Sequence, residues 1–340
     1  MPKDNENILP GFVGPATPSE SAGFAPSEMI RCDNCLRANP PTRASCLYCA
    51  AKLPVNESST RLRRPSLLTP DKLEAGYTTI FVARDQAHDT LSDVAELLKV
   101  APDALERILY ANQPLPLART ATSDEAQLLT DRLHDLGIDS KFISDEELGV
   151  EENNVIRVRS ICFEGETISV RSARRDEPVE LKYDELLLLV RARLLTKTTA
   201  VKERPTRGAE NEILDASEFH ADEAVLDLYS SSYSQTFRIA ANSFDFSCLG
   251  NQKTLLVNEN MSTIVQLIQS HAPQIKLDDS YNLVRHMVEL VWGWQKATKS
   301  DGWRRDGPWR FTVGATTTLS NENQFTRYSR LSYFLQRRNS

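Results

Sequence analysis

The sequence predicts a multidomain α+β fold with three parts: a cysteine-rich module near the start, a small β-α-α-β-α-β sandwich, and a β-rich barrel-like domain with C-terminal helices. Three observations predict it. The chain has 340 residues, about two domains' worth. Two CxxC pairs lie close together near its start. Apolar residues then recur at helical spacing, and from residue 151 onward they alternate with polar ones.

The composition is that of a chain that buries a core. Hydrophobic residues make up 40% of the sequence and charged residues 26%. The longest apolar run, residues 186–190, is far shorter than the roughly 20 residues that a membrane helix needs. The first residues include acids and lead into no apolar stretch. We therefore expect no secretory signal, no transmembrane segment and a cytoplasmic location.

Four of the six cysteines form two CxxC pairs, Cys32/Cys35 and Cys46/Cys49, with ten residues between them. Each pair can bring both sulfurs to one ion, and Zn²⁺ accepts four thiolates tetrahedrally at about 2.3 Å. Disulfides and redox chemistry are the alternatives. The expected reducing compartment argues against disulfides, and a redox CxxC needs one such pair at a strand-to-helix junction, not two in a proline-containing loop. The sequence predicts a structural Zn²⁺ with these four cysteines as ligands. Four protein ligands leave no position at which the metal could activate water.

Residues 31–53 resemble the short bacterial zinc ribbon. Their spacing is also similar to the Ran-binding-protein type of zinc finger, including Asn39. Leu36 and Ala50 stand where ribbon turns usually carry glycine, and Ile30 stands where RNA-binding fingers carry tryptophan. The resemblance implies zinc ligation by the four cysteines. We expect this zinc ribbon to serve as a contact surface.

The chain around the ribbon falls into tails, linkers and a small module. Residues 1–30 are rich in Pro, Gly and Ser and predict a disordered tail, and residues 54–75 predict a linker. Residues 76–148 predict a small α/β interaction module. Its element order is similar to that of the ClpS protease adaptor and of the ribosomal stalk protein's C-terminal domain, which implies protein binding. Only Asp85 matches the adaptor's substrate-binding residues, so recognition of amino-terminal degrons is not implied.

Residues 151–297 predict a β-rich barrel-like domain with closing helices. Several short alternating segments precede residues with helical spacing, an order that resembles pleckstrin-homology-like domains. That resemblance implies a basic rim for phosphoinositides; ordinary solvent-facing strand residues are the alternative. The candidates for the rim are Arg171, Arg174, Arg175, Arg191 and Arg193. The polar residues 198–214 predict a long loop.

Residues 298–340 form a basic, aromatic tail. From residue 296 onward the chain has nine basic and three acidic residues, whereas the remaining 295 residues have 31 basic and 44 acidic ones. The tail can pack on the acidic body, bind nucleic acid through stacking and phosphate contacts, or lie on an anionic membrane. The candidate binding residues are Arg304, Arg305, Arg310, Arg327 and Arg330.

The sequence carries no nucleotide-binding, zinc-protease or serine-hydrolase motif. Cys162 lies between apolar neighbours and predicts a small core residue, and Cys248 has no histidine near it in sequence. A cysteine-dependent enzyme stays an alternative, but we expect no catalytic residues. The sequence therefore predicts a zinc-binding, non-catalytic adaptor or scaffold with protein partners. The alternative is a nucleic-acid-associated protein that uses the ribbon and the basic tail.

Overall fold

The structure is a computed structural model that describes residues 24–43, 45–54, 65–70, 74–82, 90–111, 113–150, 154–172, 177–204, 212–307 and 310–339. The chain divides into two compact units, Met1–Arg64 and Pro65–Ser340. Most of the predicted tail and most of the predicted linker lie outside the described residues, as does Asp85. No helix in the described part is long and apolar enough to cross a membrane.

The first unit is built around its cysteines. Strands β1 (Ile30–Arg31) and β2 (Ala38–Asn39) form an antiparallel pair of two residues each. Among the residues that the structure describes, its core cluster consists of the buried Ile30, Cys32, Cys46 and Leu53, with Cys35 and Ala51 packed against them. So small a core offsets little of the conformational entropy of folding, which favours stabilisation by a metal or another cross-link.

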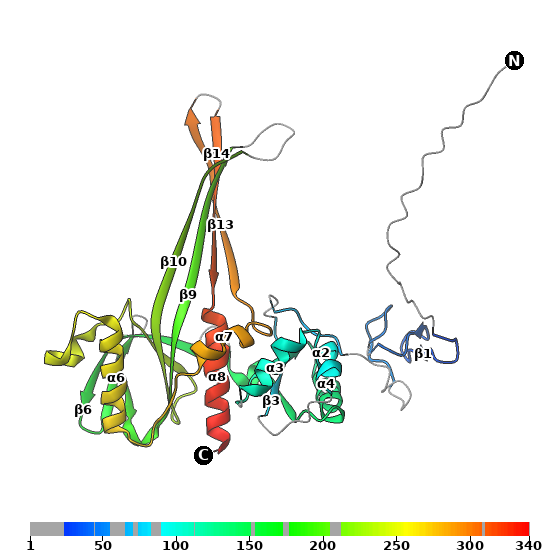
Figure 1. The fold of residues 1–340 in the computed structure, drawn as a ribbon, viewed down its shortest axis with the longest axis horizontal. Coiled ribbons are helices and arrows are strands. Elements are labelled where there is room, and N and C mark those ends of the chain that lie inside the picture. The colour runs from blue at the N-terminus through cyan, green and yellow to red at the C-terminus, as the bar shows by residue number, and fades with distance from the viewer. Residues whose placement is uncertain are drawn as a thin grey trace. The chain divides into compact units, whose positions relative to one another are not determined.

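The second unit begins with a three-stranded antiparallel sheet in the order β4-β3-β5 (Figure 1). Helices α2, α3 and α4 contribute their buried residues to one core with this sheet. The element order β3-α2-α3-β4-α4-β5 is the predicted one. The bounds are β3 Tyr77–Phe81, α2 Leu91–Leu98, α3 Pro102–Tyr110, β4 Pro116–Thr120, α4 Ser123–Asp135, β5 Ser140–Ser144 and α5 Asp145–Leu148.

Local sequence signals set the ends of these helices. Pro102 occupies the first position of α3, where its missing N–H costs nothing. The Thr122 side chain accepts a hydrogen bond from the Glu125 N–H at the start of α4. Ser144 and Glu147 form a capping box that starts α5 directly after β5.

The rest of the second unit is a large sheet in the order β13-β14-β9-β10-β11-β6-β7-β8, with β12 also beside β9. All neighbours pair antiparallel except β11 with β6 and β12 with β9. The strand bounds are β6 Val155–Glu164, β7 Thr167–Ser172, β8 Val179–Lys182, β9 Leu186–Arg204, β10 Glu212–Ser230, β11 Thr236–Ala240, β12 Lys276–Asp278, β13 Gln295–Gly307 and β14 Arg310–Ser320. The helices are η3 Tyr183–Glu185, η4 Phe246–Gln252, α6 Val257–His271, α7 Tyr281–Val288 and α8 Glu322–Asn339.

The predicted barrel is wrong, because the sheet is open and its edge strands are β13 and β8. The predicted long loop at residues 198–214 is also wrong in its described part. Strands β9 and β10 are 19 residues each and continue through this polar stretch, pairing as far as Arg204 and Glu212. Strand β14 then pairs with the outer half of β9, which extends the sheet instead of closing it.

Helices cover both faces of the inner part of this sheet. Val190 and Ala192 of β9 lie in one core with α7, α8 and the α/β module. Leu188 also lies in that core, whereas Leu189, between Leu188 and Val190 in sequence, lies in the other core with α6. This is the alternation expected of a strand that is buried on both faces. Because one core joins the module to the large sheet, the predicted boundaries near residues 148 and 297 stay predictions.

Buried carboxylates bind side chains of helix α8 and hold it in place. Arg238 of β11 donates two hydrogen bonds to Asp227 of β10, at 2.7 and 2.8 Å, and Ser329 of α8 donates to the same carboxylate. Burial lowers the pKa of Arg238, but Asp227 more than offsets this and raises it. Asp145 of α5 accepts from Arg119 and from Arg327 of α8, both at 2.6 Å. These contacts place the C-terminal helix within the body of the second unit.

We expect Arg238→Met to lower the free energy of unfolding by about 3–5 kcal/mol, because it leaves the buried Asp227 carboxylate unpaired. Asp227→Leu/Arg238→Met should recover most of that loss. Arg157→Met is the control, since Arg157 is 57% exposed in its pair with Glu322 and should change stability by about 1 kcal/mol or less. Urea unfolding measures all three. An Arg238→Met variant as stable as the control would contradict the buried pair.

Candidate metal centre

The first cysteine pair lies in a tight turn closed by backbone hydrogen bonds. The Leu36 N–H donates to the Cys32 carbonyl at 2.8 Å, and the Cys32 N–H donates to the Arg37 carbonyl at 3.0 Å. The turn directs the sulfurs of Cys32 and Cys35 to the same side.

The second pair repeats this pattern. The Ala50 N–H donates to the Cys46 carbonyl at 3.0 Å, and the Cys46 N–H donates to the Ala51 carbonyl at 2.8 Å. Each turn thus ends in the same way, one residue after its second cysteine.

The backbone is left-handed at both turn ends. Leu36 has a φ of 58° and Ala50 a φ of 57°, at the positions where ribbons usually carry glycine. A side chain in this conformation costs roughly 1–2 kcal/mol. The sequence departs from the family pattern in residue type, while the backbone keeps the conformation that glycine would adopt.

The four sulfurs lie at the separations that one ion requires. The Sγ atoms of Cys32 and Cys49 are 3.6 Å apart, those of Cys35 and Cys46 are 3.5 Å apart, and all four lie within 4.8 Å of one another. A tetrahedron with metal–sulfur bonds of about 2.3 Å has edges of about 3.8 Å. The cluster therefore fits a metal ion held by both turns, consistent with a zinc-ribbon-like site.

Asn39 connects the two turns and is fully buried. Its Nδ2 donates to the Arg37 carbonyl at 2.9 Å and to the Cys46 sulfur at 3.4 Å, and its Oδ1 accepts from the Leu47 N–H at 2.8 Å. Asn34 makes a longer contact, 3.7 Å, with the Cys49 sulfur. Sequence comparison singled out Asn39 through its spacing, but its role as a sulfur partner becomes visible only in the structure.

The surroundings of the sulfurs shift the pKa values of two of the thiols in opposite directions. Burial raises the pKa of the Cys46 thiol, but the backbone N–H groups of Tyr48 and Cys49 outweigh it and lower the pKa to about 6. The Arg37 N–H lowers the pKa of Cys35, but burial and hydrogen bonds to the other sulfurs raise it to about 12. A divalent ion displaces such protons when it binds, because only thiolates are its ligands.

Three apolar side chains beside the cysteines face solvent. Leu36 is 61% exposed, Leu47 52% and Tyr48 55%. The Arg37 guanidinium lies 4.6 Å from the centre of the Tyr48 ring, which orients that ring. The sequence alone did not distinguish these residues from core residues, because both kinds are apolar.

The five candidate arginines of the tail do not lie together. Arg327 and Arg330 are buried: Arg327 pairs with Asp145, and Arg330 donates to the Ser234 carbonyl at 2.6 Å. Arg304 and Arg305 are exposed on β13. Arg310 begins β14, and its side chain lies outside the described residues.

The arginines predicted to form a basic rim are only partly described. Arg191 pairs with Asp279 and Arg193 with Asp222. Arg171 is exposed on β7, while residues 174 and 175 are outside the described part of the chain. Arg191 and Arg193, which were expected to bind phosphate, thus each have an acidic side chain as their ion-pair partner.

The two remaining cysteines lack the character of nucleophiles. Cys162 is exposed on β6, so the prediction of a core residue is wrong; it lies on the solvent side of the strand's alternation. A hydrogen bond to Glu164 raises the pKa of Cys162, and burial raises that of Cys248 to about 11. A reactive cysteine requires a lowered pKa instead.

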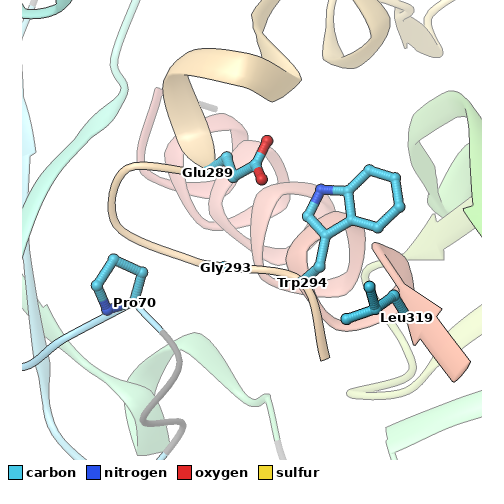
Figure 2. A pocket seen from close by; sticks show the side chains of 5 residues that line it. All are labelled: Pro70, Glu289, Gly293, Trp294 and Leu319. Atoms are coloured by element: carbon cyan, nitrogen blue, oxygen red, sulfur yellow. The ribbon is translucent and has the colours of Figure 1, made fainter. Parts of the chain in front are cut away.

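Figure 2 shows a surface pocket of about 580 Å³ beside the end of α7. It is lined by Pro70, Glu289, Gly293, Trp294 and Leu319, with Glu289 as the acidic group. The Gly293 N–H donates to the Pro70 carbonyl at 3.0 Å, and a Cβ at residue 293 would lie only 3.0 Å from that oxygen, so a side chain there would force the Pro70 backbone to shift by a few tenths of an ångström. The described lining brings no nucleophile to a base.

The chain matches no protein-family model, no curated protein and no solved structure. The cysteine cluster is therefore characterised by its own geometry. In the described part of the chain it is the one group of three or more metal-ligating side chains close enough to share an ion.

We expect Asn39→Ala to weaken metal binding by about 10–100-fold, the usual effect of removing a hydrogen-bond partner of a ligand. Competition with a zinc chelator measures the affinity, and elemental analysis should identify the metal as zinc. Asn34→Ala, which removes the longer contact, should have a smaller effect, and Cys32→Ser/Cys35→Ser should abolish binding. Unchanged affinity in Asn39→Ala would show that the amide does not support the site.

Proposed function

We propose that the protein is a zinc-binding, non-catalytic adaptor whose N-terminal ribbon binds a protein partner. The observation that carries the proposal is a four-sulfur cluster with exposed apolar side chains on the same two turns. The cluster accounts for metal binding, and the apolar side chains account for contact with another protein.

The proposed metal is structural because its ligands come from the protein alone. Cys32, Cys35, Cys46 and Cys49 would supply all four positions of a tetrahedral Zn²⁺. The bound ion would hold the two turns in place, and its coordination sphere would leave no room for substrate or reactive water. The chemistry that the ion supplies is therefore folding energy, about 10–16 kcal/mol in small zinc modules.

The proposed contact surface consists of Leu36, Leu47 and Tyr48. Leu36 and Leu47 directly follow cysteines, so the metal fixes the backbone on which they stand. Side chains held in this way lose little entropy on binding, which favours affinity. Tyrosine is also among the residue types that contribute most to protein interfaces. A partner with an apolar pocket is the class of protein that this surface suits.

We expect Leu36→Asn/Leu47→Ser/Tyr48→Ser to keep its zinc and to lose its protein partners. Asparagine tolerates the left-handed backbone at position 36, so the turn should persist. Quantitative affinity capture should show the same partners lost from this variant and from Cys32→Ser/Cys35→Ser. Asp33→Ser, a change at an exposed polar position of the same turn, should retain them. Partners retained by the triple variant would contradict this surface.

A second candidate function, nucleic-acid binding, rests on the tip of β13. Trp303 is 68% exposed beside Arg304 and Arg305; Arg305 lies on the same face of the strand as the ring, and Arg304 lies on the other face. The ring can stack on a base while the arginines contact phosphates. This candidate no longer includes Arg327 and Arg330, which are buried.

If the second function holds, Arg304→Glu/Arg305→Glu should elute from heparin at lower salt than the unmodified chain. For single strands the slope of log affinity against log salt should fall by about 1.4, for two lost phosphate contacts. Arg337→Glu/Arg338→Glu makes the same charge change on the exposed end of α8 and should leave the slope unchanged. Equal behaviour of the two variants would remove this candidate.

A further inference from the structure

Four strand segments continue beyond the helices that cover the inner sheet (Figure 1). They comprise residues 196–204 of β9, 212–221 of β10, 295–307 of β13 and 310–320 of β14, and we call them the arm. Each of the two inner strands pairs on both sides along the arm. The arm is thus a sheet of four strands with two faces.

The strand register assigns side chains to each face, because directly paired residues point to the same side. Val201 pairs with Ala216 on one side and with Ala315 on the other. Glu203, two residues on, pairs with Ile213 and with Val313. Two further pairs, Trp303 with Val313 and Arg305 with Phe311, extend this face to the outer strand.

This face is apolar and exposed near the tip. Ile213 is 65% exposed, Trp303 68% and Phe311 44%. The rings of Trp303 and Phe311 lie 6.3 Å apart, which agrees with their placement on one side. We call this set the apolar face of the arm: Val201, Ile213, Trp303, Phe311, Val313 and Ala315.

The opposite face is polar at the same level. There Asp215 pairs with Lys202, Lys299 with Thr316, and Arg304 with Thr312. A sheet with one apolar and one polar face has the pattern of a sheet that buries one side. In the described part of the chain, no helix lies over the apolar face of the arm to provide that burial (Figure 1).

A polar band separates the apolar face from the core beneath α6. One level below Val201, the same side of the sheet carries Glu218, Thr199, Thr317 and Thr298, paired across the four strands. The apolar face is therefore not the upper end of the α6 core, which ends lower in the sheet. Exposed apolar patches that stand apart from a core usually mark interaction sites.

We propose that the apolar face of the arm packs against the same face of a second copy of this chain, forming a two-fold dimer. Two sheets in contact bury their inner faces at a spacing of about 10 Å, as in a β-sandwich. A two-fold contact needs a surface that complements itself. The charged residues of this face, Glu203 and Arg305, have opposite signs, so the face does not repel an identical one.

The charge of the apolar face favours a second copy over a polyanion or an anionic lipid surface. The face carries one acidic and one basic residue, Glu203 and Arg305, so it has no net charge. Phosphate-bearing partners select surfaces with an excess of cations. A neutral surface pays no electrostatic penalty when it meets an identical one.

The dimer is tested by the mass of the full chain in solution, from light scattering and sedimentation. Trp303→Ser should weaken association at least tenfold, and Ile213→Ser/Trp303→Ser/Phe311→Ser should give a monomer. The matched control is Phe219→Ser, because Phe219 is 67% exposed on the opposite face, where it pairs with Thr198. It should leave the dimer intact. Circular dichroism and urea unfolding confirm that each variant folds.

A cross-linking experiment avoids the loss of apolar residues. In a Cys162→Ser/Cys248→Ser background, Ala315→Cys lies on the apolar face, and Thr316→Cys, its neighbour on β14, lies on the polar face. A bismaleimide with a span of about 10 Å matches the spacing of stacked sheets. It should link Ala315→Cys into dimers and leave Thr316→Cys and the background chain as monomers.

Three results would overturn the proposal. The first is an unmodified chain that stays monomeric at about 100 μM, well above the micromolar constants of weak specific interfaces. The second is equal loss of association in Trp303→Ser and Phe219→Ser, or equal cross-linking at residues 315 and 316. The third is a monomer that binds phosphatidylserine vesicles or single-stranded DNA through Trp303, which would assign the face to that partner.

Discussion

The backbone ladder between β9 and β10 is the contact on which the second unit depends. It joins two strands of 19 residues, and its inner half carries apolar side chains toward both cores. Along the outer half, β9 also pairs with β14, and β14 pairs with β13. Helices α6 and α8 pack on opposite faces of the inner half, so both cores are organised by one pair of strands. The buried pair of Asp227 and Arg238 then links β10 to β11, and through Ser329 to α8.

The metal site could be predicted from the sequence because its determinants are local. Two cysteines at CxxC spacing can direct both sulfurs to one ion through a single tight turn, and four thiols within 18 residues can reach the same ion. The left-handed backbone at Leu36 and Ala50 follows from the same constraint, against the preference of those residue types. Helices of the α/β module could also be predicted from local sequence, since proline and capping residues mark their ends.

The large sheet was harder to predict because its order depends on pairing between distant segments. Residues 198–204 are mostly polar and their two apolar residues, Ala200 and Val201, are adjacent, so they lack the alternation that identifies a strand, yet the backbone pairs with β10 and β14 on either side. Closure into a barrel or continuation into an open sheet depends on which edges meet, and no local pattern encodes that choice. The burial of Arg327 was invisible for the same reason, because its partner Asp145 lies 182 residues away.

The small core in the described part of the first unit has a consequence for the cell. A core of four side chains, two of them cysteines, offers almost nothing to hold the two turns when no ion is present. If the proposed zinc site and contact surface hold, a chain made under zinc starvation would have an intact C-terminal unit but no ordered contact surface in its first unit. Nutritional supply of the metal would then decide how many molecules can bind the proposed partner, with no change in the amount of polypeptide.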